Sequence, residues 1–181
     1  MSIEESDLKL LLKALQFSAL KHRNQRRKDV DASPYINHPI SLASILCTEA
    51  HVTDVDVICG ALLHDTVEDT ETKPEELESE FGSTIQNIVM DVTDDTLLTR
   101  PERKQAQIDH AAHLSDKAKL VKLADKISNL RDVSTNAPEH WSLERRQEYF
   151  DWAKKVIDKV RGVSPHLESI FDDAYLLRPD K

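Results

Sequence analysis

The chain has 181 residues, of which 39% are hydrophobic and 31% are charged, as expected for one globular domain with a substantial core. Its net charge of −9 argues against nucleic acid as a partner, because such binding depends on neutralising phosphates. No apolar run approaches the ~20 residues of a membrane span, and the acidic start "MSIEESD" is unlike a signal peptide, so we expect a cytoplasmic protein.

Helices dominate the sequence pattern. With seven prolines, three glycines and few β-branched runs, the chain is predicted to be an all-α bundle of roughly eight to ten helices. We expect one domain over residues 1–181 with its core at about 8–177. The first helix, residues 7 to about 25, carries leucines at three-and-four spacing.

That helix ends in "KHRNQRRK", residues 21–28, which holds five Lys or Arg in eight positions. Such a segment can hold a small polyanion locally, although it lacks the long basic track that a duplex needs. It can equally be a solvated helix end whose cations complement the helix dipole. The segment alone leaves both interpretations open.

The next helices carry the chemistry. Pro39 suits a first helical position, which would leave His38 extended just before it. Thr53, with Asp56 three residues later, resembles a capping box that opens "DVDVICGALLHDTVED". This helix is apolar on nearly all sides through Leu63, so we expect it to be central. The two cysteines fall in apolar helical patterns that favour buried free thiols; they are Cys47 and Cys59.

Further helix starts and stops are clear from the sequence. Thr72 and Pro74 open a short acidic helix, Gly82 and Ser83 precede "TIQNIVMDVTDD", and residues 95–100 read as a loop. The later helices are expected after a proline, a serine cap or both, and they begin at Pro101, after Ser115, at Ser142 with Gly162 as the end, and at Ser164–Pro165 with an end near Leu177.

The central helix has an unusual end. At ~100° per residue, His64, Asp65, Glu68 and Asp69 fall in an arc of roughly 140°. Negative side chains are unfavourable at a helix C-terminus, and their mutual repulsion would raise their pKa values unless a cation lay among them. The arrangement therefore predicts a metal ion.

More ligands must come from elsewhere in the chain. His38, in a polar turn, and Asp125, on the polar side of its helix, would complete a set of two histidines and two aspartates. Such ligands suit Mn²⁺, Fe²⁺ or Zn²⁺; an octahedral site would favour manganese, but spacing does not choose among them. Alternatively, His38 is a turn residue, and Asp125 with Lys122 and Asn129 is a solvated face.

The stretches "RRKDVDASPYINHP", "ALLHDTVEDT", "VTDD" and "KLVKLADKISNLRDV" resemble successive motifs of the HD-superfamily phosphohydrolases. Within that superfamily they are most similar to the hydrolase domain of the RelA/SpoT-type enzymes, and to its small stand-alone animal forms, since no synthetase domain follows. The resemblance covers roughly residues 8–177.

The resemblance implies a role for each matching residue. It implies an Mn²⁺ ion held by His38, His64, Asp65 and Asp125, with Glu68 and Asp69 positioning the attacking water and assisting proton transfer. The substrate contacts that it implies are Arg27, Lys28, Arg100, Asn129, Arg145 and Tyr149.

The implied reaction removes the 3′-diphosphate of ppGpp to give GDP and pyrophosphate. NADPH, with its 2′-phosphate, is the alternative substrate, and a binding module without catalysis is the alternative from another class, against which the two catalytic carboxylates argue. Two departures from the family pattern, the glycine-free turn "DVDASPY" and Ser128 in place of an aromatic residue, are expected to touch no ligand. The sequence does not predict the oligomeric state.

Overall fold

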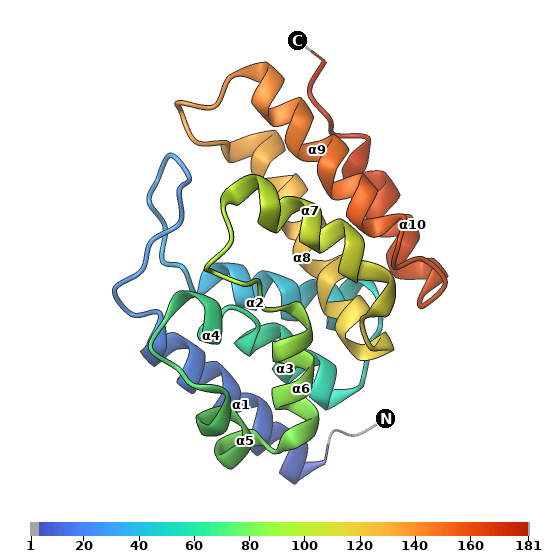
Figure 1. The fold of residues 1–181 in the computed structure, drawn as a ribbon. Coiled ribbons are helices and arrows are strands. Elements are labelled where there is room, and N and C mark those ends of the chain that lie inside the picture. The colour runs from blue at the N-terminus through green and yellow to red at the C-terminus, as the bar shows by residue number, and fades with distance from the viewer. Residues whose placement is uncertain (1–3, 181) are drawn as a thin grey trace.

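The computed structural model describes residues 4–180, and within that range it is all-α, without a β-strand (Figure 1). The expected number of helices is confirmed. The helices are α1 (Glu5–Lys21), α2 (Asn37–Ser44), α3 (Val55–Leu63), α4 (Thr66–Asp69), α5 (Pro74–Phe81), α6 (Ser83–Val92), α7 (Arg100–His110), α8 (Asp116–Asn136), α9 (Leu143–Ile157) and α10 (Pro165–Tyr175). A π-helical turn (Ile45–Glu49) follows α2, and a 3-10 turn (Ala111–His113) follows α7.

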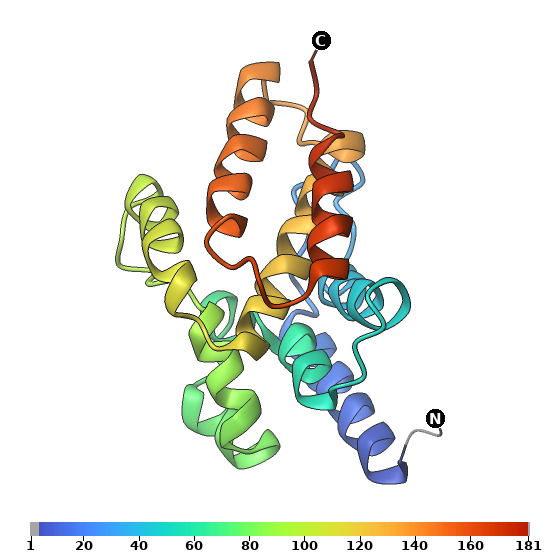
Figure 2. The same ribbon diagram turned by 90° about the vertical axis from the view of Figure 1, so that its right-hand side faces the viewer.

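Two helices organise the core. α8 packs against α2, α3, α6, α9 and α10. In Figure 2, α9 and α10 flank one end of α8, and α1, α5 and α6 lie beyond its other end. α3 is central as predicted, because every residue from Val57 to Leu63 is buried. Gly60 permits the close approach of α6, since a Cβ added there would lie 2.6 Å from Ile88 Cγ2.

Most helix caps follow the prediction. The hydroxyls of Ser115, Ser142 and Ser164 each accept a backbone N–H of the first turn of α8, α9 and α10. The predicted Thr53 cap is wrong, because Asp54 caps α3 by accepting from Asp56 N at 3.0 Å. An Asp side chain directly before the helix reaches that N–H better than a Thr one residue earlier.

Two helices are shorter than predicted. α1 ends at Lys21, because His22 leaves the helical region and its N–H closes the last turn onto Ser18 O at 2.9 Å. α9 ends at Ile157, so Gly162 is not its cap. That glycine instead takes a φ of 101° in the connection to α10, a conformation that side chains disfavour.

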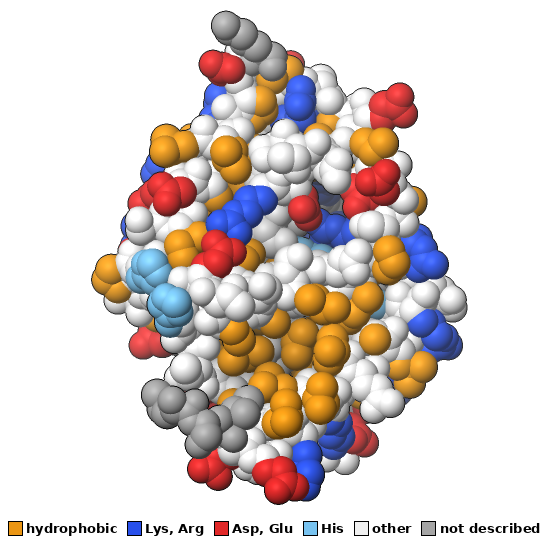
Figure 3. Space-filling model, turned by 180° about the vertical axis from the view of Figure 1, so that it is seen from behind, with side chains coloured by type: hydrophobic (Ala, Val, Ile, Leu, Met, Phe, Trp, Pro, Cys, Tyr) orange, Lys and Arg blue, Asp and Glu red, His pale blue; other side chains and the backbone are white. Residues whose placement is uncertain are grey.

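Hydrophobic side chains gather on the lower half of the back face (Figure 3). α1 exposes Leu8 and Leu12 to solvent, and α2 exposes Ile40. The prediction that both cysteines are buried holds for Cys59 and is wrong for Cys47, which lies exposed where a π-helical turn shifts the helix register. None of the described helices is both long and apolar enough to cross a membrane.

Candidate metal centre and substrate cavity

The prediction of one continuous helix through Asp69 is wrong, because the helix is interrupted at His64 and Asp65. α3 ends at Leu63, Asp65 has φ −100° and ψ 1°, and α4 begins at Thr66. Adjacent residues of a continuous helix point ~100° apart. The break lets both side chains turn to one point, and His64 Nε2 lies 2.8 Å from Asp65 Oδ2.

His38 approaches the same point from another part of the chain. It is buried within the first turn of α2 and not extended before it, because Asn37 N and His38 N bond to Pro34 O and Tyr35 O and start the helix early. Its ring meets that of His64 edge to face, with centroids 5.2 Å apart. His38, His64 and Asp65 each offer a ligand atom, and all three atoms lie within 4.8 Å of one another.

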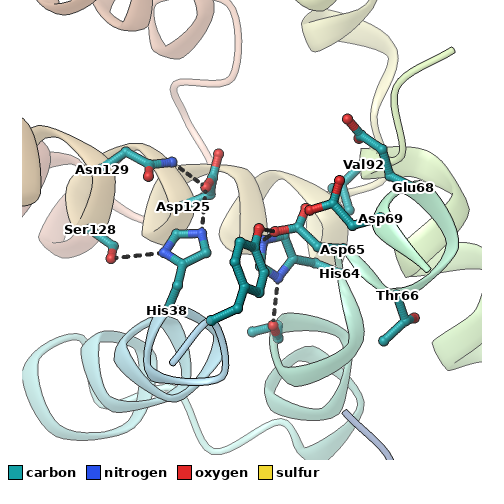
Figure 4. Close-up of polar contacts among 12 residues, drawn as sticks. His38, His64, Asp65, Thr66, Glu68, Asp69, Val92, Asp125, Ser128 and Asn129 are labelled. Carbon is teal, nitrogen blue, oxygen red and sulfur yellow. Dashed lines mark hydrogen bonds and ion pairs between the residues drawn. The ribbon is translucent and has the colours of Figure 1, made fainter. Parts of the chain in front are cut away.

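Asp125 on α8 borders this group without belonging to it. Its Oδ1 is 3.3 Å from His38 Nε2, and its carboxylate accepts from Asn129 Nδ2 at 2.6 Å (Figure 4). The carboxylate also accepts from Lys126 Nζ at 3.0 Å. Lys122, one turn earlier, is buried and donates to Val92 O at 3.1 Å. A simple solvated face is therefore the wrong interpretation of this side of α8.

Each histidine is oriented through its second nitrogen. His64 Nδ1 lies 2.9 Å from Ala61 O, so it carries the proton, and buried Nε2 has no hydrogen-bond partner. His38 Nδ1 lies 3.2 Å from Ser128 Oγ, so the expectation that Ser128 touches no ligand is wrong. The Tyr35 hydroxyl donates to Asp65 Oδ2. Such second contacts fix the direction of metal ligands.

The electrostatics favour ionised carboxylates. Burial alone would raise the pKa of Asp65, but the adjacent His64 imidazole outweighs this effect and holds that pKa well below its usual range. Burial likewise opposes ionisation of Asp125, yet the Lys126 ammonium keeps its pKa well below normal. For His64, Asp65 outweighs burial and raises the imidazole pKa.

These residues fit a divalent cation. A nitrogen without a partner faces a carboxylate oxygen at 2.8 Å, near the roughly 3 Å that separates neighbouring ligands on one ion with metal–ligand distances of about 2.0–2.2 Å. Imidazole and carboxylate ligands without thiolate suit manganese, iron or zinc. The donor set does not select among them.

Glu68 and Asp69 stand on α4 beside this cluster, and both line its cavity of about 200 Å³. Glu68 Oε2 accepts from Asp94 N at 3.1 Å. Burial raises the pKa of Glu68 to about 7, so this carboxylate can gain or lose a proton near neutral pH. Asp69 is exposed and accepts from Gln25 Nε2 at 2.8 Å, which links α4 to the basic segment.

A larger cavity of about 390 Å³ adjoins the cluster, and Arg27, Tyr35, Asp69 and Asn129 line both. Five of the six predicted substrate residues line this larger cavity: Arg27, Lys28, Arg100, Asn129 and Tyr149. The sixth, Arg145, lines a neighbouring cavity of about 320 Å³ together with Arg100 and Tyr149. Its guanidinium lies 4.5 Å from the centre of the Trp141 ring.

The basic segment divides into two parts. Lys21 pairs with Glu76 at 3.0 Å, and Arg23 donates to Leu20 O at 2.9 Å, so these two cations serve the end of α1. Arg26, Arg27 and Lys28 line the large cavity instead. The interpretation as a helix end therefore fits Lys21 and Arg23, and binding of a polyanion by the other three cations stays a prediction.

Several residues of the site were missed from sequence. Arg27 donates to Asp132, which lies three residues after Asn129 on the same side of α8. Trp141 lines both the cavity of about 390 Å³ and the neighbouring cavity of about 320 Å³. Lys104 lines the cavity of about 320 Å³, and its ammonium lies 5.0 Å from the centre of the Trp152 ring. The spacing of Asp132 was the one available signal, since the others depend on how α7 and α9 pack.

The fold and the site define an all-α protein in which two histidines and an aspartate that could hold a metal ion lie beside a cavity lined by cations. The chain belongs to the HD domain family, whose profile matches residues 14–151. It is 53% identical over 173 residues, 96% of each chain, to guanosine-3′,5′-bis(diphosphate) 3′-pyrophosphohydrolase MESH1 of Danio rerio. The human protein of that name is 52% identical over 163 residues, 90% of this chain and 91% of its own.

Structural comparison agrees. A solved structure described as "A metazoan ortholog of SpoT hydrolyzes ppGpp and plays a role in starvation responses" matches with a TM-score of 0.92 and 46% identity, covering 98% of both chains. The predicted resemblance to the HD superfamily and its RelA/SpoT-type members is thereby confirmed.

Proposed function

We propose that this chain is a manganese-dependent hydrolase that converts ppGpp and water to GDP and pyrophosphate. The observation that carries the proposal is the convergence of His38, His64 and Asp65, with Asp125 beside them, under a cavity lined by cations. The name shared by relatives that match nearly the whole chain supports the same substrate. We take residues 1–181 as one catalytic domain, and the expected cytoplasmic location stays a prediction.

The chain's own groups suit this reaction. Arg27 lines both cavities, so its guanidinium can hold a phosphate next to the histidine–aspartate cluster. Glu68, with its pKa near 7, can take a proton from the attacking water and return it to the leaving 3′-oxygen. Tyr149 and Trp141 offer aromatic surface to the nucleoside. A bound divalent cation would polarise the phosphoryl oxygens and acidify water.

Hydrolysis of ppGpp forms one bond and breaks one. Water oxygen bonds to the phosphorus attached to the ribose 3′-oxygen, and the bond between that phosphorus and the 3′-oxygen breaks. Pyrophosphate leaves, and the 3′-oxygen takes a proton to give GDP. Arg100 and Arg145 line the cavity of about 320 Å³, where they can neutralise negative charge on the departing pyrophosphate.

Purified protein supplied with Mn²⁺ should release pyrophosphate from ppGpp, and Asp65→Ala should abolish both the release and the bound metal. Turnover that persists in Asp65→Ala would overturn the assignment. Asp109→Ala, an exposed position on α7, is the matched control and should retain both.

NADPH is the competing substrate, because its 2′-phosphate also lies on a ribose and would meet the same cations. The ratio of the two kcat/KM values decides between the substrates, since it reports relative transition-state stabilisation. A ratio in favour of NADPH would assign the same site to phosphomonoester hydrolysis. Nucleotide binding without turnover under Mn²⁺, Fe²⁺ or Zn²⁺ would instead indicate a binding module.

A further inference from the structure

Ser128 makes a contact that the reaction described above does not use. It lies on α8, is buried, and places its hydroxyl oxygen 3.2 Å from Nδ1 of His38, which is 90 residues earlier in the chain (Figure 4). The other nitrogen of the same ring, Nε2, faces Asp125 Oδ1 at 3.3 Å and the proposed metal cluster. The two contacts compete for the single proton of the neutral ring.

The choice of tautomer decides whether His38 can bind a metal. A proton on Nε2 would be donated to Asp125 and would block the nitrogen that faces the cluster. A proton on Nδ1 is donated to Ser128 and leaves the Nε2 lone pair free. His64 has the same requirement but meets it with a backbone carbonyl, Ala61 O, at 2.9 Å.

We propose that Ser128 is a positioning residue that holds His38 in the Nδ1-protonated tautomer and so prepares Nε2 to bind the divalent cation. The inference rests on the proposed metal site but not on the identity of the substrate. A serine hydroxyl suits this task, because it is small enough to be buried between α2 and α8 and its oxygen can accept a hydrogen bond from Nδ1–H.

The test is the affinity of Ser128→Ala for Mn²⁺, measured from the electron paramagnetic resonance signal of the free ion. We expect a loss of roughly 10- to 100-fold, as for other second contacts of metal-binding histidines. The matched control is Ser134→Ala on the same helix, whose hydroxyl bonds only to Arg131 O at 2.7 Å in the structure, and its affinity should be unchanged. Ser128→Thr, which keeps the oxygen, should restore most of the loss.

A second readout needs no metal. In wild-type protein freed of metal by a chelator, the ¹⁵N chemical shifts of His38 should report a protonated Nδ1. In Ser128→Ala they should report a larger population with the proton on Nε2. Wild-type Mn²⁺ affinity in Ser128→Ala, or an unchanged tautomer, would overturn the proposal. If Ser128→Ala is unfolded, Ser128→Cys, which has the same shape with a slightly larger atom and a weak acceptor, decides the question by the same two measurements.

Failure of the proposed function looks different. A wild type that binds Mn²⁺ tightly but leaves ppGpp intact would remove the substrate assignment, while the comparison between Ser128→Ala and Ser134→Ala would still decide the role of Ser128.

Discussion

His64 Nε2 and Asp65 Oδ2 lie 2.8 Å apart, and the nitrogen nevertheless has no hydrogen-bond partner. Both residues belong, with His38, to the group whose ligand atoms all lie within 4.8 Å of one another. Since Asp65 raises the pKa of His64 against the effect of burial, protons compete with a cation for this nitrogen more strongly as the pH falls.

Metal should therefore stabilise the fold, and more weakly at acid pH. At an Mn²⁺ concentration about 100 times its Kd we expect a gain of about 2.7 kcal/mol in the free energy of unfolding. Urea titrations with Mn²⁺ and with chelator measure the gain at neutral and at acid pH. Asp65→Ala should show none of it, whereas equal stability of the wild type with and without Mn²⁺ would contradict the metal assignment.

Glu68 should make the free energy of unfolding of the metal-free protein depend on pH. Burial raises its folded pKa to about 7 from 4.5, so the folded state holds this proton over that interval and the unfolded chain does not. The contribution of Glu68 is fully present below the unfolded pKa and is lost as pH rises through 7, by about 3 kcal/mol at most.

Glu68→Gln resembles the protonated form and should remove this loss. Unfolding in urea with chelator at about pH 5 and about pH 8 measures the difference. Glu78→Gln, on the exposed side of α5, should keep the pH dependence of the wild type. A wild type that gains stability relative to Glu68→Gln as the pH rises would contradict the shift.

Much of the scaffold follows from local rules. The serine caps of α8, α9 and α10 and the burial of α3 need only sequence periodicity and capping preferences. The same rules place His38, His64 and Asp65 near helix ends. They do not show that α3 breaks at His64, because nothing local requires a break.

The rest of the site depends on packing between distant segments. Ser128 and His38 meet only because α2 crosses α8, and Lys126 is buried because Asp125 accepts from it and the Trp152 ring lies 4.4 Å away. On a helical wheel of α8, Ser128 and Lys126 look like parts of its polar face. Burial of a polar side chain requires partners, and those partners lie elsewhere in the sequence.

Arg27 should hold the substrate through charge. Replacing it by Met removes a charge-assisted hydrogen bond to phosphate that is worth about 1.5–3 kcal/mol, so KM for ppGpp should rise roughly 10- to 100-fold with a smaller change in kcat. Arg23→Met is the matched control, because Arg23 bonds to Leu20 O and does not line the cavity. Steady-state kinetics at two salt concentrations should also show a weaker salt dependence in Arg27→Met. Equal KM values for the two variants would place the anion elsewhere.

Gly60 should couple the core to the metal centre. In Gly60→Ala the new Cβ would lie 2.6 Å from Ile88 Cγ2, so α3 and α6 must separate, at a cost of about 1–3 kcal/mol that exceeds the roughly 1 kcal/mol gained in helix propensity. Thermal unfolding should show a lower Tm. Adding Ile88→Ala removes the clashing methyl, so the double variant should be more stable than the sum of the single effects predicts. Because α3 ends at Leu63, directly before His64, the shift should also weaken Mn²⁺ binding; additive stabilities with unchanged affinity would show that the helix pair absorbs the methyl without moving.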